Sequence, residues 1–358
     1  MRAPNIPKIS LALAVFSLLV VIVRQPVTAQ VNTYTVVELG ALTEEGVGIA
    51  RDINNSGHVV GKSGGETGTD TRAVLWTTRG KENLGTLIAG DYSGAFAINN
   101  SGEVVGTSNT ATTLRAFRWT RRDGLQDLGT LFEDTGSEAF GINSSGKAVG
   151  TSSGSTGIRA VLWKPDGTIT NLGTLPGGDY SRAFAINDID QVVGTSSSSL
   201  GLRAVLWTSD GAIQDLGTLP GDTSSEAFDI NRDGTVVGHS RGPNGTRAFL
   251  WTANGGMQSL GTLPGGDYSR AVAINNDGQV VGTSSSSVGI RAFLWTGSGG
   301  MKDLNQLIPA SLGLVVSEAT CINEVGQIGV LSGVANHAHT DGDEREHLYH
   351  SFLLTPIQ

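Results

Sequence analysis

The sequence is poor in cysteine, in charged side chains and in long apolar runs. Cys321 is the single cysteine, so an intramolecular disulfide is excluded and packing must stabilise the fold. Charged residues make up 16% of the 358 residues, and the formal net charge is −9. No basic run is present, which argues against a nucleic-acid partner, because such binding depends on neutralising phosphates.

The first 29 residues are typical of an export signal. Arg2 and Lys8 precede an apolar run, Leu11–Val23, and residues 27–29 (Val-Thr-Ala) resemble a small-residue cleavage site. The alternative is an uncleaved anchor, but a bilayer span needs about 20 apolar residues and Arg24 ends this run early. We predict a signal peptide over 1–29 and an acidic mature protein, extracellular or periplasmic in a bacterium, without a membrane span.

The chain is rich in glycine and contains an internal repeat. Gly accounts for 51 residues, and one dodecamer, LGTLPGGDYSRA, occurs at 172–183 and again at 260–271. All tryptophans share one register, 43 or 44 residues apart: Trp76, Trp119, Trp163, Trp207, Trp251 and Trp295. An Ile-Asn pair marks seven copies: Asn54, Asn99, Asn143, Asn187, Asn231, Asn275 and Asn323. The dodecamer therefore belongs to a repeating architecture.

Each copy reads as four short strands separated by Gly-rich turns. In copy 6 we predict strands over 271–274, 279–283, 291–295 and 301–304, with an Asn-Gly turn between the first two. Four strands in about 44 residues are typical of a β-propeller blade. A β-solenoid is the alternative, although it has a shorter period per coil and fewer hairpin turns.

The two ends of the repeat array complement one another. Copy 7 stops after its third strand, whereas residues 34–42 form a spare strand ending in LGAL, like the fourth strands elsewhere. We therefore predict an all-β, seven-bladed β-propeller of four-stranded blades, closed by the N-terminal strand. It would be a single domain over 30–358, with its repeats at 43–87, 88–131, 132–175, 176–219, 220–263, 264–307 and 308–358.

Three recurring motifs carry a resemblance to a known family. DLGTL, AFAIN followed by VVGTS, and RAFLW resemble the HAF-type extracellular bacterial repeats over nearly all of the mature chain. The family's His before Ala-Phe is kept here as His350 in copy 7. It is replaced by arginine in the other copies: Arg72, Arg115, Arg159, Arg203, Arg247 and Arg291. The resemblance implies an exported repeat protein and no particular activity; the arginines themselves read as a structural ladder.

Candidate ligand-binding residues lie on the face that carries the links between blades. Copies 2, 4 and 6 have an Asp-Tyr pair there: Asp91-Tyr92, Asp179-Tyr180 and Asp267-Tyr268. A tyrosine beside a carboxylate could stack on and hydrogen-bond a sugar or a peptide. The alternative is structural, with Asp capping a turn and Tyr covering the next blade. The Asn-Gly hairpins of the opposite face read as purely structural.

A second candidate set is a ring of alternating charge one residue before the first-strand alanine. Successive copies have Ile49, Gly94, Glu138, Arg182, Glu226, Arg270 and Glu318. We expect each arginine to pair with the glutamates on both sides, and we count Arg182 and Arg270 among the ligand-binding candidates. Registration of the blades is the alternative role for these charges.

The loop of copy 7 breaks the repeat with a cluster of metal-ligating residue types. His337, His339, Asp341, Asp343 and His347 could bind a divalent metal, which is the one cofactor that the sequence suggests. A solvated insertion is the alternative, because no recognised ligand spacing is present. The pattern GxSxG at 150–154 lacks the strand–turn–helix context of a hydrolase nucleophile.

Near-identical blades argue against the unique constellation that catalysis needs. We therefore predict no catalytic residues and an exported, non-enzymatic protein that binds or displays an unknown extracellular ligand, carbohydrate or protein. The alternatives are an exported propeller enzyme, a hydrolase or a lyase, and a structural or adhesive surface protein.

Overall fold

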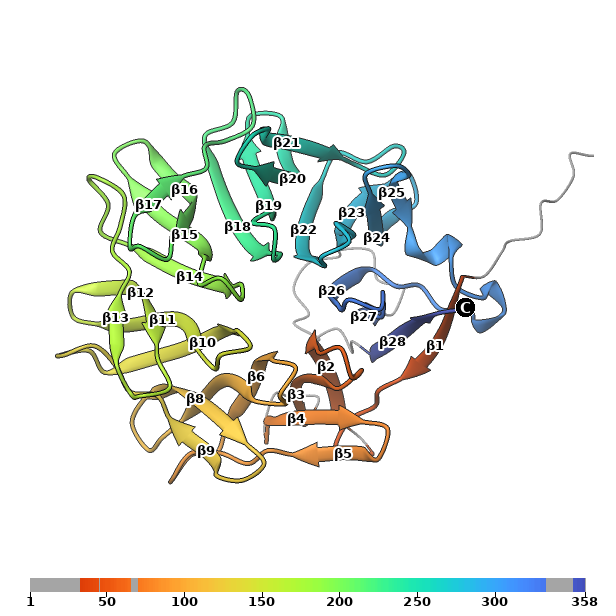
Figure 1. Ribbon diagram of the computed structural model, residues 1–358. Coiled ribbons are helices and arrows are strands. Elements are labelled where there is room, and N and C mark those ends of the chain that lie inside the picture. The colour runs from red at the N-terminus through yellow and green to blue at the C-terminus, as the bar shows by residue number, and fades with distance from the viewer. Residues whose placement is uncertain (1–32, 45, 66–69, 333–349, 358) are drawn as a thin grey trace, which may run out of the picture. The chain divides into compact units, whose positions relative to one another are not determined.

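The computed structural model describes residues 33–44, 46–65, 70–332 and 350–357. They form seven four-stranded antiparallel sheets, arranged as the blades of a ring (Figure 1). The prediction of an all-β, seven-bladed β-propeller is confirmed. Helical structure in these residues consists of two 3-10 turns, η1 (Leu304–Gln306) and η2 (Ala310–Leu312).

The strands of each blade follow one another from the centre of the ring outward (Figure 1). The innermost strands are β2 (Gly46–Ile53), β6 (Ser93–Ile98), β10 (Gly136–Ile142), β14 (Ser181–Ile186), β18 (Ser224–Ile230), β22 (Ser269–Ile274) and β26 (Glu318–Ile322). The second strands are β3 (Val59–Gly65), β7 (Val104–Asn109), β11 (Ala148–Gly154), β15 (Val192–Ser198), β19 (Val236–Gly242), β23 (Val280–Ser286) and β27 (Ile328–Ser332).

The two outer strands of each blade complete the sheets. The third strands are β4 (Arg72–Thr77), β8 (Leu114–Thr120), β12 (Gly157–Trp163), β16 (Gly201–Trp207), β20 (Gly245–Thr252), β24 (Gly289–Thr296) and β28 (His350–Pro356). The outermost strands are β5 (Gly80–Asn83), β9 (Gly124–Asp127), β13 (Ile169–Asn171), β17 (Ile213–Asp215), β21 (Gly256–Gly261), β25 (Gly300–Asp303) and β1 (Tyr34–Glu38).

The Ser-rich stretches between the second and third strands are mostly strand, where the sequence suggested loops. In copy 6 the predicted strands end at residue 283 and resume at 291. In the structure β23 and β24 pair as far as Ser286 and Gly289. Serine is a common turn residue, but here the ladder hydrogen bonds continue to a two-residue turn.

A bulge in the innermost strands explains the glycine of the repeated VVG motif. In blade 4 the register between β14 and β15 shifts between Ala183 and Ala185. A Cβ atom on Gly194 would lie 1.9 Å from the carbonyl oxygen of Arg182. Only glycine fits this approach, so the motif fixes how closely the second strand packs on the first.

Hydrophobic clusters fill all seven interfaces between neighbouring blades. Between blades 4 and 5, for example, Val193 and Leu206 pack with Ala227, Phe249 and Trp251. Burial of one such large side chain contributes about 1.5–3 kcal/mol. Packing of this kind stabilises a ring whose single cysteine, Cys321, is itself buried between blades 7 and 1.

Buried serines form hydrogen bonds from each blade to the preceding blade and to the link that enters the blade. Ser181 Oγ accepts a hydrogen bond from Ala160 N of the preceding blade at 2.9 Å. Ser196 Oγ accepts one from Leu175 N, in the link that enters the blade, also at 2.9 Å. The Ser of VVGTS therefore has a structural role inside the fold.

The N-terminal strand closes the ring, as the sequence predicts. β1 pairs with β28 in antiparallel register, from Tyr34 opposite Pro356 to Glu38 opposite Phe352 (Figure 1). Ile357 N donates to Thr33 O at 2.8 Å, which places the first and last described residues side by side. Blade 7 is thus built from both ends of the described chain.

Candidate functional site

Seven asparagines follow the innermost strands and form a closed ring of hydrogen bonds. Each Nδ2 donates to the backbone oxygen of the next blade's asparagine over 3.0–3.3 Å. The ring consists of Asn54, Asn99, Asn143, Asn187, Asn231, Asn275 and Asn323, and the last donates to the first. Each Oδ1 also accepts N–H groups of its own turn, as Asn187 does from Ile189 and Gln191.

A polar cavity of about 190 Å³, lined by residues of all seven blades, lies beside this asparagine ring. The ring's amide groups are already bonded within the protein, so they offer few free donors or acceptors to a ligand. This saturation agrees with the structural role predicted for the Asn-Gly hairpins.

The charge ring lies at the other end of the innermost strands. Arg182 Nη2 lies 3.8 Å from Glu138 Oε2, which is an ion pair between blades 3 and 4. Arg270 differs, because its guanidinium lies over the ring of Phe228, 4.2 Å from the centroid. The expectation that each arginine pairs with both neighbouring glutamates is therefore wrong in the described residues. Arg182 pairs with Glu138 and not with Glu226, and at Arg270 a cation–π contact takes the place of both ion pairs.

Phenylalanines of four neighbouring innermost strands contact one another beside the charge ring. The pairs Phe96–Phe140, Phe140–Phe184 and Phe184–Phe228 have ring centroids 5.4, 5.7 and 5.5 Å apart. The arc ends on His239, whose imidazole stacks on Phe228 at 5.4 Å. An apolar aromatic surface therefore lies directly against the charged groups.

His239 forms a titratable pair with Glu226 that the sequence did not reveal. Its Nε2 lies 3.7 Å from Glu226 Oε1, across the β18–β19 ladder. Burial, followed by Arg270 and Arg241, lowers the pKa of His239 to about 4. Burial also raises the pKa of Glu226, while Arg270 and Arg182 oppose that rise.

Two of the predicted tyrosines lie close to the charge ring. A Cβ atom on Gly94 would lie 3.3 Å from the hydroxyl oxygen of Tyr92. Burial raises the pKa of Tyr92, and Arg51 and Glu138, from the two adjacent blades, act on it with opposite signs. Burial likewise raises the pKa of Tyr180, on which Arg182 and Glu226 act. The structure thus brings the tyrosine and charge candidates together.

The aspartates of the Asp-Tyr pairs brace the turn in front of the innermost strand. Ser197 Oγ donates to Asp179 Oδ1 at 3.1 Å and accepts from the N–H groups of Asp179 and Tyr180. Ser285 does the same for Asp267 and Tyr268. In blade 2, Asn109 replaces the serine and bonds Asp91 and Tyr92. These contacts agree with turn capping by Asp and leave the role of Tyr open.

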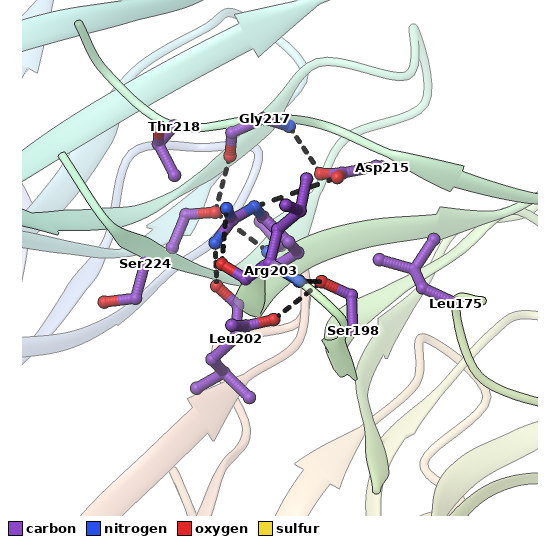
Figure 2. Close-up of polar contacts among 12 residues, drawn as sticks. Leu175, Ser198, Leu202, Arg203, Asp215, Gly217, Thr218 and Ser224 are labelled. Atoms are coloured by element: carbon purple, nitrogen blue, oxygen red, sulfur yellow. Dashed lines mark hydrogen bonds and ion pairs between the residues drawn. The ribbon is translucent and has the colours of Figure 1, made fainter. Parts of the chain in front are cut away.

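The repeated arginine of the third strand braces the same face. Arg203 Nη2 donates to Leu200 O of its own hairpin at 2.8 Å, and Nη1 donates to Thr223 O of the next blade at 2.7 Å. Figure 2 shows Arg203 with Leu202 and with Asp215, whose Oδ2 lies 3.8 Å from Nε. These contacts fit the structural ladder predicted for this arginine.

The predicted metal ligands His337, His339, Asp341, Asp343 and His347 lie outside the described residues. Within the described ranges, no group of three or more His, Cys, Asp or Glu side chains is placed to hold a metal ion. In the same part of the chain, no helix has the length and apolar character of a membrane span.

Two aspartates replace the usual small residue in the innermost strands of blades 1 and 5. The Asp229 carboxylate accepts hydrogen bonds from Ile230 N and, in the next blade, Ile274 N, both at 2.8 Å. Burial raises the pKa of Asp229 to about 7 and that of Asp52 to about 6, against the effect of these backbone bonds. Both carboxyl groups therefore bind protons more readily in the folded chain than in the unfolded one.

The Asp229→Ala variant should reduce the pH dependence of stability. Between pH about 4 and 7 the folded wild-type protein binds more protons than the unfolded chain, so its free energy of unfolding falls as pH rises. Alanine occupies this position in blades 2, 4 and 6. We expect the difference in stability between pH 5 and pH 8 to shrink by an amount on the order of a few kcal/mol. Urea denaturation at both pH values measures it. The exposed-site variant Asp233→Ala is the control, and equal pH slopes for wild type and Asp229→Ala would contradict the prediction.

The fold and the site together define a β-propeller with an aromatic and charged surface at one end of its inner strands. No family model matches the chain, and no curated protein matches it. An oligogalacturonate lyase from Vibrio parahaemolyticus is 11% identical with a TM-score of 0.52, and the match covers 90% of this chain and 97% of the lyase. An oligogalacturonate lyase in complex with manganese is 10% identical with a TM-score of 0.53, covering 92% and 99%. At such identities the likeness shows the fold alone.

Proposed function

We propose that the protein is an exported, non-enzymatic propeller that binds a saccharide at the charge ring. The observation that supports this most is the contrast between the two ends of the innermost strands. The asparagine ring has its amides bonded, whereas Arg182 Nε, Arg270 Nε and His239 Nδ1 gather at the charge ring as buried nitrogens without a partner among the described residues. Arg118 Nε, Arg159 Nε, Trp163 Nε1 and Trp207 Nε1 are also without a partner there, but they do not form such a cluster with the aromatic arc. Unused donors beside aromatic rings are what a saccharide needs, because its hydroxyls both donate and accept while its C–H face packs on aromatic surface.

Export and membership of the HAF-type family are part of this proposal. The first 29 residues carry the signal-like pattern, and the repeat motifs carry the resemblance. A divalent metal held by the copy 7 loop would be an addition to the saccharide site, not a requirement for it.

A glycan array of neutral and acidic oligosaccharides, followed by calorimetric titration, tests the saccharide proposal. The Tyr92→Ala and Tyr180→Ala variants are expected to weaken binding about tenfold each, through loss of aromatic contact. Arg232→Gln, an exposed change at the asparagine-ring end, is the control and should leave affinity unchanged. Binding of peptides and of no glycan, or equal loss in the control, would contradict the proposal.

Enzymatic activity is the second candidate, and the Glu226–His239 pair favours it. The two titratable groups lie 3.7 Å apart, and burial shifts the pKa of each, lowering that of His239 and raising that of Glu226. Perturbed pKa values of neighbouring groups cluster at functional sites. A reducing-end assay on oligosaccharides decides between the two functions. Turnover that disappears in His239→Thr would establish an enzyme, and binding without turnover would support the scaffold.

A further inference from the structure

Arg270 differs from the equivalent arginine of blade 4 in what it contacts. The guanidinium of Arg182 lies 5.9 Å from the centroid of Phe140 and pairs with Glu138 at 3.8 Å. The guanidinium of Arg270 lies closer to its phenylalanine, at 4.2 Å, and no carboxylate of the described residues lies within 4.0 Å of it. Its Nε is buried without a partner. Arg270 is therefore a cation held in position by an aromatic ring.

His239 adds a second unpartnered nitrogen to the same phenylalanine. Blades 2, 3, 4 and 6 have threonine in this register: Thr107, Thr151, Thr195 and Thr283. The imidazole of His239 stacks on Phe228 with an interplanar angle of 27°, and its Nδ1 has no partner among the described residues. A neutral imidazole has one donor and one acceptor nitrogen. Because Nε2 faces the carboxylate of Glu226, which only accepts, Nε2 holds the proton and Nδ1 is left to accept a hydrogen bond from a ligand hydroxyl.

The unpartnered guanidinium donor of Arg270 favours an anionic ligand. A buried donor without a partner costs about 1–3 kcal/mol, and more when the group is charged, so an acceptor placed here relieves that cost. The planar guanidinium fork fits a carboxylate with two parallel hydrogen bonds. Glu226 and Glu318 flank Arg270 in register, and they repel a singly charged carboxylate less than a doubly charged phosphate.

We infer that Arg270, Phe228 and His239, at the junction of blades 5 and 6, bind an acidic saccharide such as a uronate, with Arg270 donating to its carboxylate and His239 Nδ1 accepting from a hydroxyl. This inference rests on the saccharide-binding function proposed above. Tyr268 precedes the same innermost strand and offers an aromatic ring next to the site in sequence. This site occurs once among the described blades. Only at the junction of blades 5 and 6 does a histidine, His239, lie beside an arginine, Arg270, that has no carboxylate of the described residues within 4.0 Å.

Calorimetric titration of the protein with D-glucuronate, D-glucose and D-glucose 6-phosphate tests the carboxylate site. We expect glucuronate to bind at least about tenfold tighter than glucose. Arg270→Gln should abolish that preference, His239→Thr should weaken it, and Arg270→Lys should retain only part of it because the fork is lost. Arg232→Gln, an exposed change at the asparagine-ring end, is the control and should keep the preference. Thermal melting of each variant confirms that it is folded.

An independent measurement follows the imidazole of His239 by ¹⁵N NMR, which should shift with glucuronate and not with glucose. Equal affinity for glucose and glucuronate would overturn the carboxylate site while leaving saccharide binding intact. Tighter binding of glucose 6-phosphate would overturn the assignment to a carboxylate. No binding of any sugar, there or on the glycan array, would overturn both proposals.

Discussion

Removal of residues 33–38 is expected to abolish the single cooperative melting transition that we expect for the intact ring. Without β1 the ladder groups of β28 lose their partners over five residue pairs, which leaves an open edge in blade 7. Tyr34, 6% exposed, is also lost from the cluster that contains Ile308 and Leu354. We expect aggregation, or a broad transition at lower temperature, measured by calorimetry and light scattering.

A circular permutant provides the control for that deletion. Residues 33–42 can be joined after Gln358 through a short linker, because Tyr34 lies opposite Pro356 and Thr33 O accepts a hydrogen bond from Ile357 N. The permutant restores β1 as the second arm of a hairpin with β28 and should melt cooperatively. A deletion variant that melts like wild type would show that blade 7 does not depend on the N-terminal strand.

The Asn187→Ala variant is expected to lower the free energy of unfolding by about 3 kcal/mol. The side chain is buried and makes four hydrogen bonds. Oδ1 accepts from Ile189 N and Gln191 N, and Nδ2 donates to Asn231 O and Gln191 Oε1. Alanine removes all four and opens the link between blades 4 and 5. The urea midpoint measures the loss.

Two further variants separate the turn from the link between blades. Asn187→Asp keeps the two accepting bonds but sets a carboxylate against the carbonyl of Asn231, so it should cost about as much as alanine. Asn100→Ala removes one exposed bond, from Asn55 N, and should cost less than about 1 kcal/mol. If Asn187→Ala costs no more than Asn100→Ala, the asparagine ring does not stabilise the propeller.

The architecture could be predicted from the sequence because the repeat unit occurs seven times. The tryptophan and Ile-Asn registers gave the number of blades, and the spare strand before copy 1 gave the closure. Strand ends were less predictable, because serine is common in turns. The hydroxyls of Ser196 and Ser284 are instead bonded inside the blade, and pairing with the third strand overrides local preference.

The sequence predicted the tyrosines and arginines of the site, but not its phenylalanines, its histidine or the contacts among them. The register placed Arg182 and Arg270 in one ring, but it could not show that Phe228 would take the place of a glutamate beside Arg270. His239 could not be identified as part of the site, because a lone histidine in a threonine position carries no motif. Its position directly opposite Glu226 in the ladder was the available signal, and it becomes visible only once strand register is known.

Residue types at the charge ring alternate from one blade to the next, and an odd number of blades cannot alternate all the way round a closed ring. Tyrosine or arginine in even blades and glutamate in odd blades repeat every two blades, but a closed ring of seven cannot alternate without a mismatch. The mismatch falls at blades 1 and 2, where the ring positions are Ile49 and Gly94 and carry no charge. This uncharged part of the ring makes the blades inequivalent, so a ligand on the ring axis has one preferred orientation on the surface. An even number of blades could have kept perfect alternation, and its binding surface would then have lacked that single direction.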